Sequence, residues 1–197
     1  TASAAALPAL QAAHPELPII GVIEPGAEAA VAATKTGRIA VLATEGTVRG
    51  GAYQREILRR MPQAHVAAIP ATLFVALAEE GWTQGDVASA TARRYLAPVL
   101  AQPAAAPDVL VLGCTHFPPL ADVIQREAGA GIRIVDSAVT TAEALADLLA
   151  TRGLAAPAGE HTTRRFLVTD GEERFTRVGP LFLGEPIAAG AVERVDL

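Results

Sequence analysis

Short apolar runs that alternate with helical stretches are the feature that most restricts how this chain of 197 residues can fold. Strands buried on both faces of a parallel sheet read as continuous apolar runs, whereas the helices between them show apolar residues at helical spacing. We expect strands over residues 18–23, 38–44, 65–70, 108–113, 132–136 and 164–169. We expect helices over residues 3–13, 26–35, 48–61, 71–80, 84–101, 117–128, 138–152 and 171–183. This order predicts an α/β protein with doubly wound parallel sheets.

Residues that favour helix ends lie near several of the predicted boundaries. Gly37 follows the second helix as a C-cap, and Thr44 or Thr47 can cap the third. Pro118 and Pro119 suit the first turn of the helix predicted near residue 117. Local signals and the apolar pattern therefore agree on the fold class.

Composition excludes several classes of function. Apolar residues make up 51% of the chain, which is enough for a globular core, and Gly, Pro or charged residues interrupt every apolar run before it reaches the length of a membrane helix. The 21 acidic residues outnumber the 16 basic ones, which are scattered, so nucleic acid is not expected as a partner. The first residues lack the basic start of a secretory signal, so we expect a cytoplasmic location.

The segment VLVLGCTHFPPL places the chain's single cysteine in a turn between a strand and a helix. Cys114, Thr115 and His116 follow the strand end at Gly113. Backbone N–H groups at a helix start favour an anion, so they can lower the pKa of a thiol or hold a substrate carboxylate. His116 can provide a proton or stabilise a thiolate. The alternative is a buried structural cysteine beside a capping threonine, and position alone does not choose between the two.

Two further pairs of polar residues have both a functional and a structural interpretation. Thr44 and Thr47 follow another strand end and either bind an anion or cap the next helix. Glu79 and Glu80 end a helix, where carboxylates are unfavourable to the helix dipole, so one of them points into a cleft or both are solvated.

Motifs of other enzyme classes are missing from the sequence. We find no phosphate-binding P-loop, no GxGxxG, no GxSxG and no His/Cys cluster with metal-binding spacing. Lys35 is the only lysine, which makes a pyridoxal-phosphate enzyme an unattractive interpretation. We therefore predict neither a cofactor nor a metal.

Several segments together resemble bacterial glutamate racemases, which belong to the aspartate/glutamate racemase superfamily. They are GVIEPGAEAA (21–30), TGRIAVLATEGTVRGGAYQ (36–54), IPATLFVALAEEG (69–81), LGCTHFPPL (112–120) and VTDGEERFTRVGPLFLGEPI (168–187). The resemblance covers nearly the whole chain and does not rest on one short motif.

The resemblance implies an enzyme with two similar α/β domains that enclose glutamate between them. A thiolate removes the Cα proton on one face and a thiol returns a proton on the other, without pyridoxal phosphate or metal, and D-glutamate is supplied for peptidoglycan. Residues 23–136 correspond to the second domain, and residues 1–22 with 137–197 correspond to an incomplete first domain. The implied partner is glutamate, with no nucleic acid and no membrane, and a homodimer is compatible with the family.

The resemblance also assigns roles to individual residues. The implied catalytic residues are Cys114 as the second thiol, with His116 and Glu79 in support. The implied substrate-binding residues are Thr1, Thr44, Thr47, Thr115 and His116.

The family's first cysteine lies in a Cys-Asn-Thr-Ala-Ser motif, and this chain opens with Thr1, Ala2 and Ser3. We therefore expect the chain to start just after that cysteine and to be inactive as a racemase when alone. Two alternatives stay open. One is an aspartate racemase, although its relatives favour glutamate where this chain has His116. The other is a non-catalytic fragment or binding remnant.

Overall fold

A four-stranded parallel sheet forms the centre of the computed structural model, which describes residues 2–157, 163–188 and 190–196. Its strands lie in the order β2-β1-β3-β4. They are β1 (Arg38–Ala43), β2 (His65–Pro70), β3 (Val109–Leu112) and β4 (Arg133–Asp136). Leu42 of β1 pairs with Ile69 of β2 and with Leu112 of β3, and Leu112 pairs with Asp136 of β4. The four strands therefore end at one edge of the sheet, where open α/β sheets usually bind ligands.

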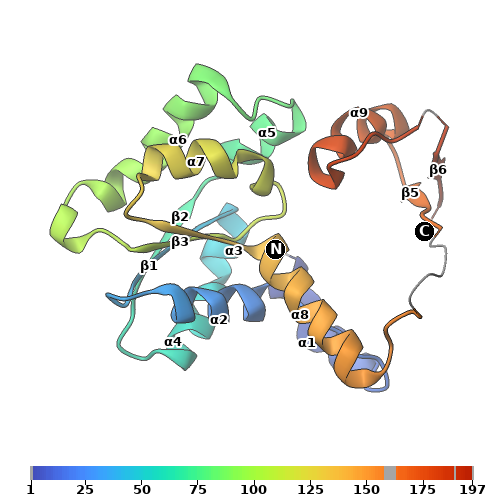
Figure 1. Ribbon diagram of the computed structural model, residues 1–197, viewed down its shortest axis with the longest axis horizontal. Helices are drawn as coiled ribbons and strands as arrows, with labels where there is room; N and C mark the ends of the chain where they lie inside the picture. Colours follow the sequence, from blue (N-terminus) through green and yellow to red (C-terminus); the bar gives the residue numbers. More distant parts are fainter. Residues whose placement is uncertain (1, 158–162, 189, 197) are drawn as a thin grey trace.

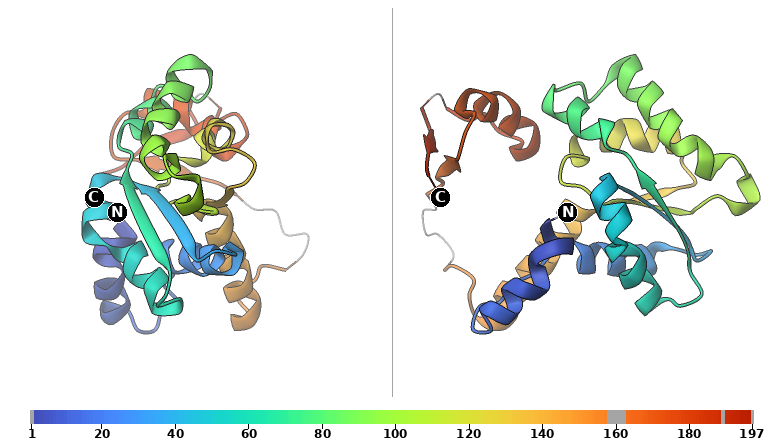
Figure 2. Two further views of the ribbon diagram at one scale, coloured as in Figure 1. Left: turned by 90° about the vertical axis from the view of Figure 1, so that its left-hand side faces the viewer. Right: turned by 180° about the vertical axis from the view of Figure 1, so that it is seen from behind.

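Helices cover both faces of this sheet (Figures 1 and 2). One face carries α2 (Ile23–Ala33) and α4 (Ala52–Arg60), and the other carries α5 (Leu73–Glu79), α6 (Gly85–Leu100) and α7 (Ala121–Ala128). Short helices α3 (Glu45–Gly50), η1 (Pro103–Ala105) and η2 (Pro118–Leu120) lie in the connections. Along β1, Ala40 and Leu42 join the core under α5, α6 and α7, while Ile39 and Val41 join the core under α2 and α4. Burial on both faces explains why the strands read as continuous apolar runs.

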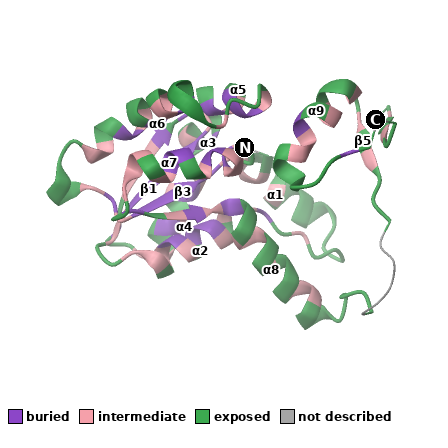
Figure 3. Cartoon of the chain, turned by 45° about the horizontal axis from the view of Figure 1, so that its top comes forward, coloured by how far each residue is buried: buried purple, intermediate pink, exposed green. Residues whose placement is uncertain are grey.

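The two ends of the chain extend away from the sheet. They contain α1 (Ala2–Ala13) and α8 (Ser137–Arg152), followed by β5 (Phe166–Val168), α9 (Glu172–Leu183) and β6 (Val192–Arg194). Strands β5 and β6 pair in parallel as a separate two-stranded sheet. Among the described residues of these helices, only Ser137 in α8 and Val178 in α9 are buried, whereas burial is concentrated around the large sheet (Figure 3). The four-stranded sheet with its helices is thus the principal core.

The predicted strand over residues 18–23 is wrong. Residues 18–21 have no regular structure, and α2 already begins at Ile23. Gly21 packs on α1, where an added Cβ would lie 2.6 Å from Leu7 Cδ2, and the Val22 backbone N–H donates to Ser3 Oγ at 3.4 Å. The segment contacts a helix, whereas a strand needs the backbone groups of a neighbouring strand as hydrogen-bond partners.

Other differences concern helix ends and one short strand. The single helix predicted over residues 48–61 is two helices, because Gly51 adopts the left-handed conformation with φ 65° between α3 and α4. Helix α2 ends at Ala33 with Thr34 as its C-cap, so Gly37 lies beyond the helix end. Strand β6 was not predicted.

The α/β class with a doubly wound parallel sheet is confirmed. All four strands of the large sheet lie between Arg38 and Asp136, within the range 23–136 predicted for the second domain. The division into domains itself stays a prediction. In the described part of the chain, no helix is both long enough and apolar enough to cross a membrane.

Candidate active site

The turn that carries Cys114 is held tightly against β1 and α4. The Gly113 backbone N–H donates to Leu42 O at 2.7 Å, which extends the pairing of β3 with β1 by one residue. A Cβ on Gly113 would lie 2.9 Å from Tyr53 Cε2 and 3.1 Å from Leu42 O. Only glycine therefore fits at this position without a shift of its neighbours, and the close approach fixes where the chain enters the turn.

The other side of the turn is anchored by Phe117. Its backbone N–H donates to Cys114 O at 3.1 Å, and its buried ring contacts Phe74 edge-on at a centroid distance of 5.4 Å. The helix predicted from residue 117 begins as the 3₁₀ helix η2 at Pro118, and the α-helix starts only at Ala121. The thiol therefore does not lie at the N-terminus of an α-helix, contrary to the sequence interpretation.

Cys114 is a free, half-buried thiol. Burial raises the pKa of the Cys114 thiol, and the hydrogen bond with the His116 backbone lowers it by less than burial raises it. The expected lowering of the thiol pKa is thus wrong for this conformation, because the loss of solvent outweighs the backbone donor. Thr115, which lies between Cys114 and His116, is exposed.

His116 connects the thiol to a carboxylate. Its Nδ1 lies 4.0 Å from Cys114 Sγ, and its Nε2 lies 2.7 Å from Glu79 Oε1 at the end of α5. With its proton on Nε2, the imidazole donates to the carboxylate and turns the Nδ1 lone pair towards the thiol. The ring of Phe182 from α9 contacts His116 edge-on at 5.8 Å. This arrangement can move a proton between the thiol and the imidazole.

Glu79 also contacts a residue that the sequence did not single out. Its second oxygen, Oε2, lies 2.9 Å from Nη2 of Arg174 on α9. Only 26% of the Glu79 side chain is exposed, so the carboxylate has a partner on each oxygen and is not simply solvated. Of the two interpretations of Glu79, the structure favours a carboxylate that faces the cysteine turn.

Thr44 and Thr47 lie beside the cysteine turn at the same edge of the sheet. Leu42 pairs with Leu112, so Thr44 and Cys114 both stand two residues past a registered pair on neighbouring strands. The two threonine hydroxyl oxygens are 3.0 Å apart. Thr44 is the N-cap residue of α3, but its side chain makes no capping hydrogen bond. Thr1, the remaining predicted substrate contact, lies outside the described residues.

Tyr53 packs against Gly113 at the start of the cysteine turn and was also missed by the sequence interpretation. It is fully buried, and its hydroxyl donates to Val22 O at 3.4 Å and is hydrogen-bonded with Ser137. Burial raises the pKa of Tyr53 to about 12. Val22 directly precedes α2, before the large sheet begins, and Ser137 begins α8, directly after the last strand of that sheet. Tyr53 therefore contacts the chain both before and after the large sheet. An apolar α4 face was the only sequence signal for it.

A cavity of about 460 Å³ adjoins the carboxylate between α5 and α9. Its lining includes Glu79, Arg174, Phe175 and Phe182. Across the residues that the structure describes, no group of three or more His, Cys, Asp or Glu side chains could hold a metal ion. The cavity lies next to the proton-transfer groups, and part of its lining is aromatic.

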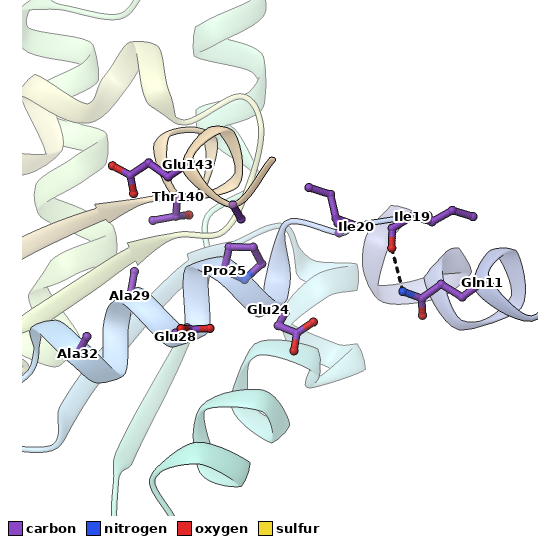
Figure 4. Close-up of a pocket in the computed structure, with 12 residues that line it drawn as sticks. Gln11, Ile19, Ile20, Glu24, Pro25, Glu28, Ala29, Ala32, Thr140 and Glu143 are labelled. Atoms are coloured by element: carbon purple, nitrogen blue, oxygen red, sulfur yellow. Dashed lines mark hydrogen bonds between the residues drawn. The ribbon is translucent and has the colours of Figure 1, made fainter. Parts of the chain in front are cut away.

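A second cavity of about 450 Å³ lies between the α1–α2 connection, α2 and α8 (Figure 4). It contains none of the predicted site residues, and the carboxylates of Glu24, Glu28 and Glu143 lie along it. An acidic lining repels a dicarboxylate such as glutamate, so this cavity is a poor candidate for the substrate site.

The family model described as Asp/Glu/Hydantoin racemase matches residues 1–145. The chain is 45% identical over 197 residues to the glutamate racemase of Geobacter metallireducens, covering all of the chain and 71% of that protein. It is 42% identical over 181 residues to the glutamate racemase of Syntrophus aciditrophicus, covering 92% of the chain and 65% of that protein.

Solved structures give the same result. The chain aligns over its full length with 71% of a glutamate racemase from Bacillus anthracis, at 32% identity and a TM-score of 0.89. It also aligns over 99% of its length with 70% of the glutamate racemase from Francisella tularensis in complex with D-glutamate, at 28% identity and a TM-score of 0.86. These relatives and structures are longer than the chain, which spans 65% to 71% of them.

Proposed function

The chain belongs to the Asp/Glu/Hydantoin racemase family, and from this premise we propose that it serves in the interconversion of L- and D-glutamate. The reaction is an isomerisation at Cα, and the proposal gives Cys114 one of the two proton transfers. The observation that carries it is the connected series of Cys114 Sγ, the His116 imidazole and the Glu79 carboxylate at the carboxyl edge of the sheet.

In the proposed reaction, a thiolate takes the Cα proton and becomes a thiol, and the electron pair stays on Cα, delocalised into the adjacent carboxylate. A thiol on the opposite face then gives its proton to Cα. Because burial favours the protonated form of Cys114, the structure's conformation suits the donating half of the cycle. His116 and Glu79 would return or withdraw the proton between turnovers. The 197 residues contain only this cysteine, so they serve one face of the substrate.

The substrate carboxylate next to Cα needs hydrogen-bond donors close to the thiol. Thr44 and Thr47 supply hydroxyls at the neighbouring strand end, and Thr115 supplies a third within the turn. We propose that Thr44 and Thr47 bind the carboxylate and that Thr115 and Thr1 also contact the substrate. The proposal follows the family resemblance and the shared edge of β1 and β3.

The test is proton exchange at Cα of each glutamate enantiomer, followed by ¹H NMR in D₂O without an added cofactor. We expect the 197-residue chain to exchange one enantiomer faster than the other, and glutamate faster than aspartate. Cys114→Ser should slow this exchange by about 100-fold or more, the usual size of an acid–base contribution. Equal rates for the variant and the original chain would contradict the proposal. Faster exchange of aspartate would instead favour an aspartate racemase.

A binding remnant is the second candidate, and the single cysteine is the observation that favours it. It predicts that glutamate binds, with chemical-shift changes at Thr44 and Thr47, but that Cα does not exchange. A homodimer and a supply of D-glutamate for peptidoglycan are parts of the proposal that rest on the resemblance, and a cytoplasmic location stays a prediction. Sedimentation of the purified chain would test the dimer.

A further inference from the structure

We propose that Arg174 of α9 is a positioning residue for proton transfer at Cys114, acting through Glu79 and His116; this inference rests on the function proposed above. Arg174 lies in the C-terminal part of the chain, outside the four-stranded sheet that carries the cysteine. It does not contact the thiol. Its role would be to decide where the Glu79 carboxylate, and thus the imidazole, is held.

Glu79 is held through both of its carboxylate oxygens. Oε2 lies 2.9 Å from Arg174 Nη2, while Oε1 lies 2.7 Å from His116 Nε2. A carboxylate held on both oxygens cannot rotate about its last bond without breaking one of these contacts. The Arg174 contact therefore selects the rotamer in which Oε1 faces the imidazole.

The Arg174–Glu79 ion pair lies at the surface. The Arg174 side chain is 57% exposed, whereas that of Glu79 is 26% exposed. Ion pairs this exposed contribute little to folding stability, because water screens the charges and the side chains lose freedom. Removing the guanidinium should therefore alter the orientation of Glu79 much more than it alters folding.

Helix α9 also contacts the imidazole itself, through a second side chain. Phe182 packs edge-on against His116 at 5.8 Å, and both Phe182 and Arg174 border the cavity next to Glu79. Two side chains from one helix thus hold the two ends of the His116–Glu79 pair. The position of α9 is in this way linked to the proton-transfer groups, although the helix carries none of them.

Three variants test this inference on the full chain. Arg174→Gln removes the charge, Arg174→Lys keeps a charge but lacks the planar fork, and Arg177→Gln is a matched control because Arg177 is exposed on the same helix. The first readout is Cα exchange of glutamate at several concentrations. We expect Arg174→Gln to lower the maximal rate by about tenfold with little change in KM, since misplaced groups slow chemistry more than binding. Arg174→Lys should recover part of the rate.

The second readout is the ¹⁵N resonance of the His116 imidazole, which does not depend on turnover. Arg174→Gln should shift this resonance, and Arg177→Gln should leave it unchanged. If the original chain exchanges no Cα proton, the proposed function fails, and the resonance alone still decides whether Arg174 sets the His116 environment. An Arg174→Gln protein that matches Arg177→Gln in both readouts would overturn the inference.

Discussion

Replacing Gly113 with alanine should damage the cysteine turn through one added methyl group. The new Cβ would lie 2.9 Å from Tyr53 Cε2, 3.1 Å from Leu42 O and 3.3 Å from Val41 Cγ1. Tyr53 cannot retreat easily, because its ring is fully buried in the core under α2 and α4. The strain must therefore move the Cys114 turn or the end of β1.

Inserting a methyl group into a packed site usually costs about 1–3 kcal/mol. In a chain of this size each kcal/mol lowers Tm by about 2–4 °C, so a decrease of roughly 2–12 °C is expected. Thermal unfolding followed by circular dichroism measures it. Gly131→Ala is the matched control, since a Cβ there meets nothing within 4 Å and the backbone has no positive φ. A Gly113→Ala protein as stable as Gly131→Ala would refute the argument that close packing fixes this turn.

Three further predictions follow from the pKa directions and hydrogen bonds. Burial raises the pKa of Cys114, so its rate of labelling by iodoacetamide should rise with pH only above the usual pKa of a cysteine. Equal pH profiles of labelling for the folded and the urea-unfolded chain would contradict this. Burial raises the pKa of Tyr53 to about 12, so one of the two tyrosines should ionise late in an absorbance titration. Because the folded pKa is raised, the contribution of Tyr53 to stability is complete below the ordinary tyrosine pKa and is lost as pH rises towards 12. Burial alone would raise the pKa of Asp108, but hydrogen bonds from Thr34, Lys35 and Thr36 outweigh burial and lower this pKa. The ionised Asp108 therefore stabilises the fold at neutral pH, and this stabilisation is lost as pH falls through the lowered pKa. Asp108→Asn should lose about 1–2 kcal/mol in urea unfolding at pH 7, and this difference should shrink as pH falls through the lowered pKa.

The strands of the large sheet could be predicted because strands that are buried on both faces appear as continuous apolar runs in the sequence. The run over residues 65–70 has the same bounds as β2, and the other three strands differ only at their ends. The same reasoning failed for residues 18–23, because an apolar run does not reveal whether a neighbouring strand is available. It also missed β6, whose three residues include Glu193 and Arg194 and form a strand only by pairing with β5.

The candidate site divides in a similar way. The cysteine turn stands out locally, since a strand, three polar or reactive residues and two prolines follow one another in the sequence. Its chemistry was predicted less well. The structure places a 3₁₀ helix after the turn, so burial and not a helix N-terminus has the largest effect on the pKa of the thiol. Arg174 and Tyr53 act through contacts between segments far apart in the chain, which no local pattern records.

In the proposed reaction, the Cys114 thiol itself transfers the Cα proton. The most direct measurement follows Cα exchange of glutamate while iodoacetamide modifies the chain's single cysteine, with the extent of modification read by mass spectrometry of the Cys114 peptide. We expect exchange to fall in proportion to the fraction of unmodified thiol, and glutamate to slow the modification. Exchange that continues at its original rate after Cys114 is fully modified would contradict it.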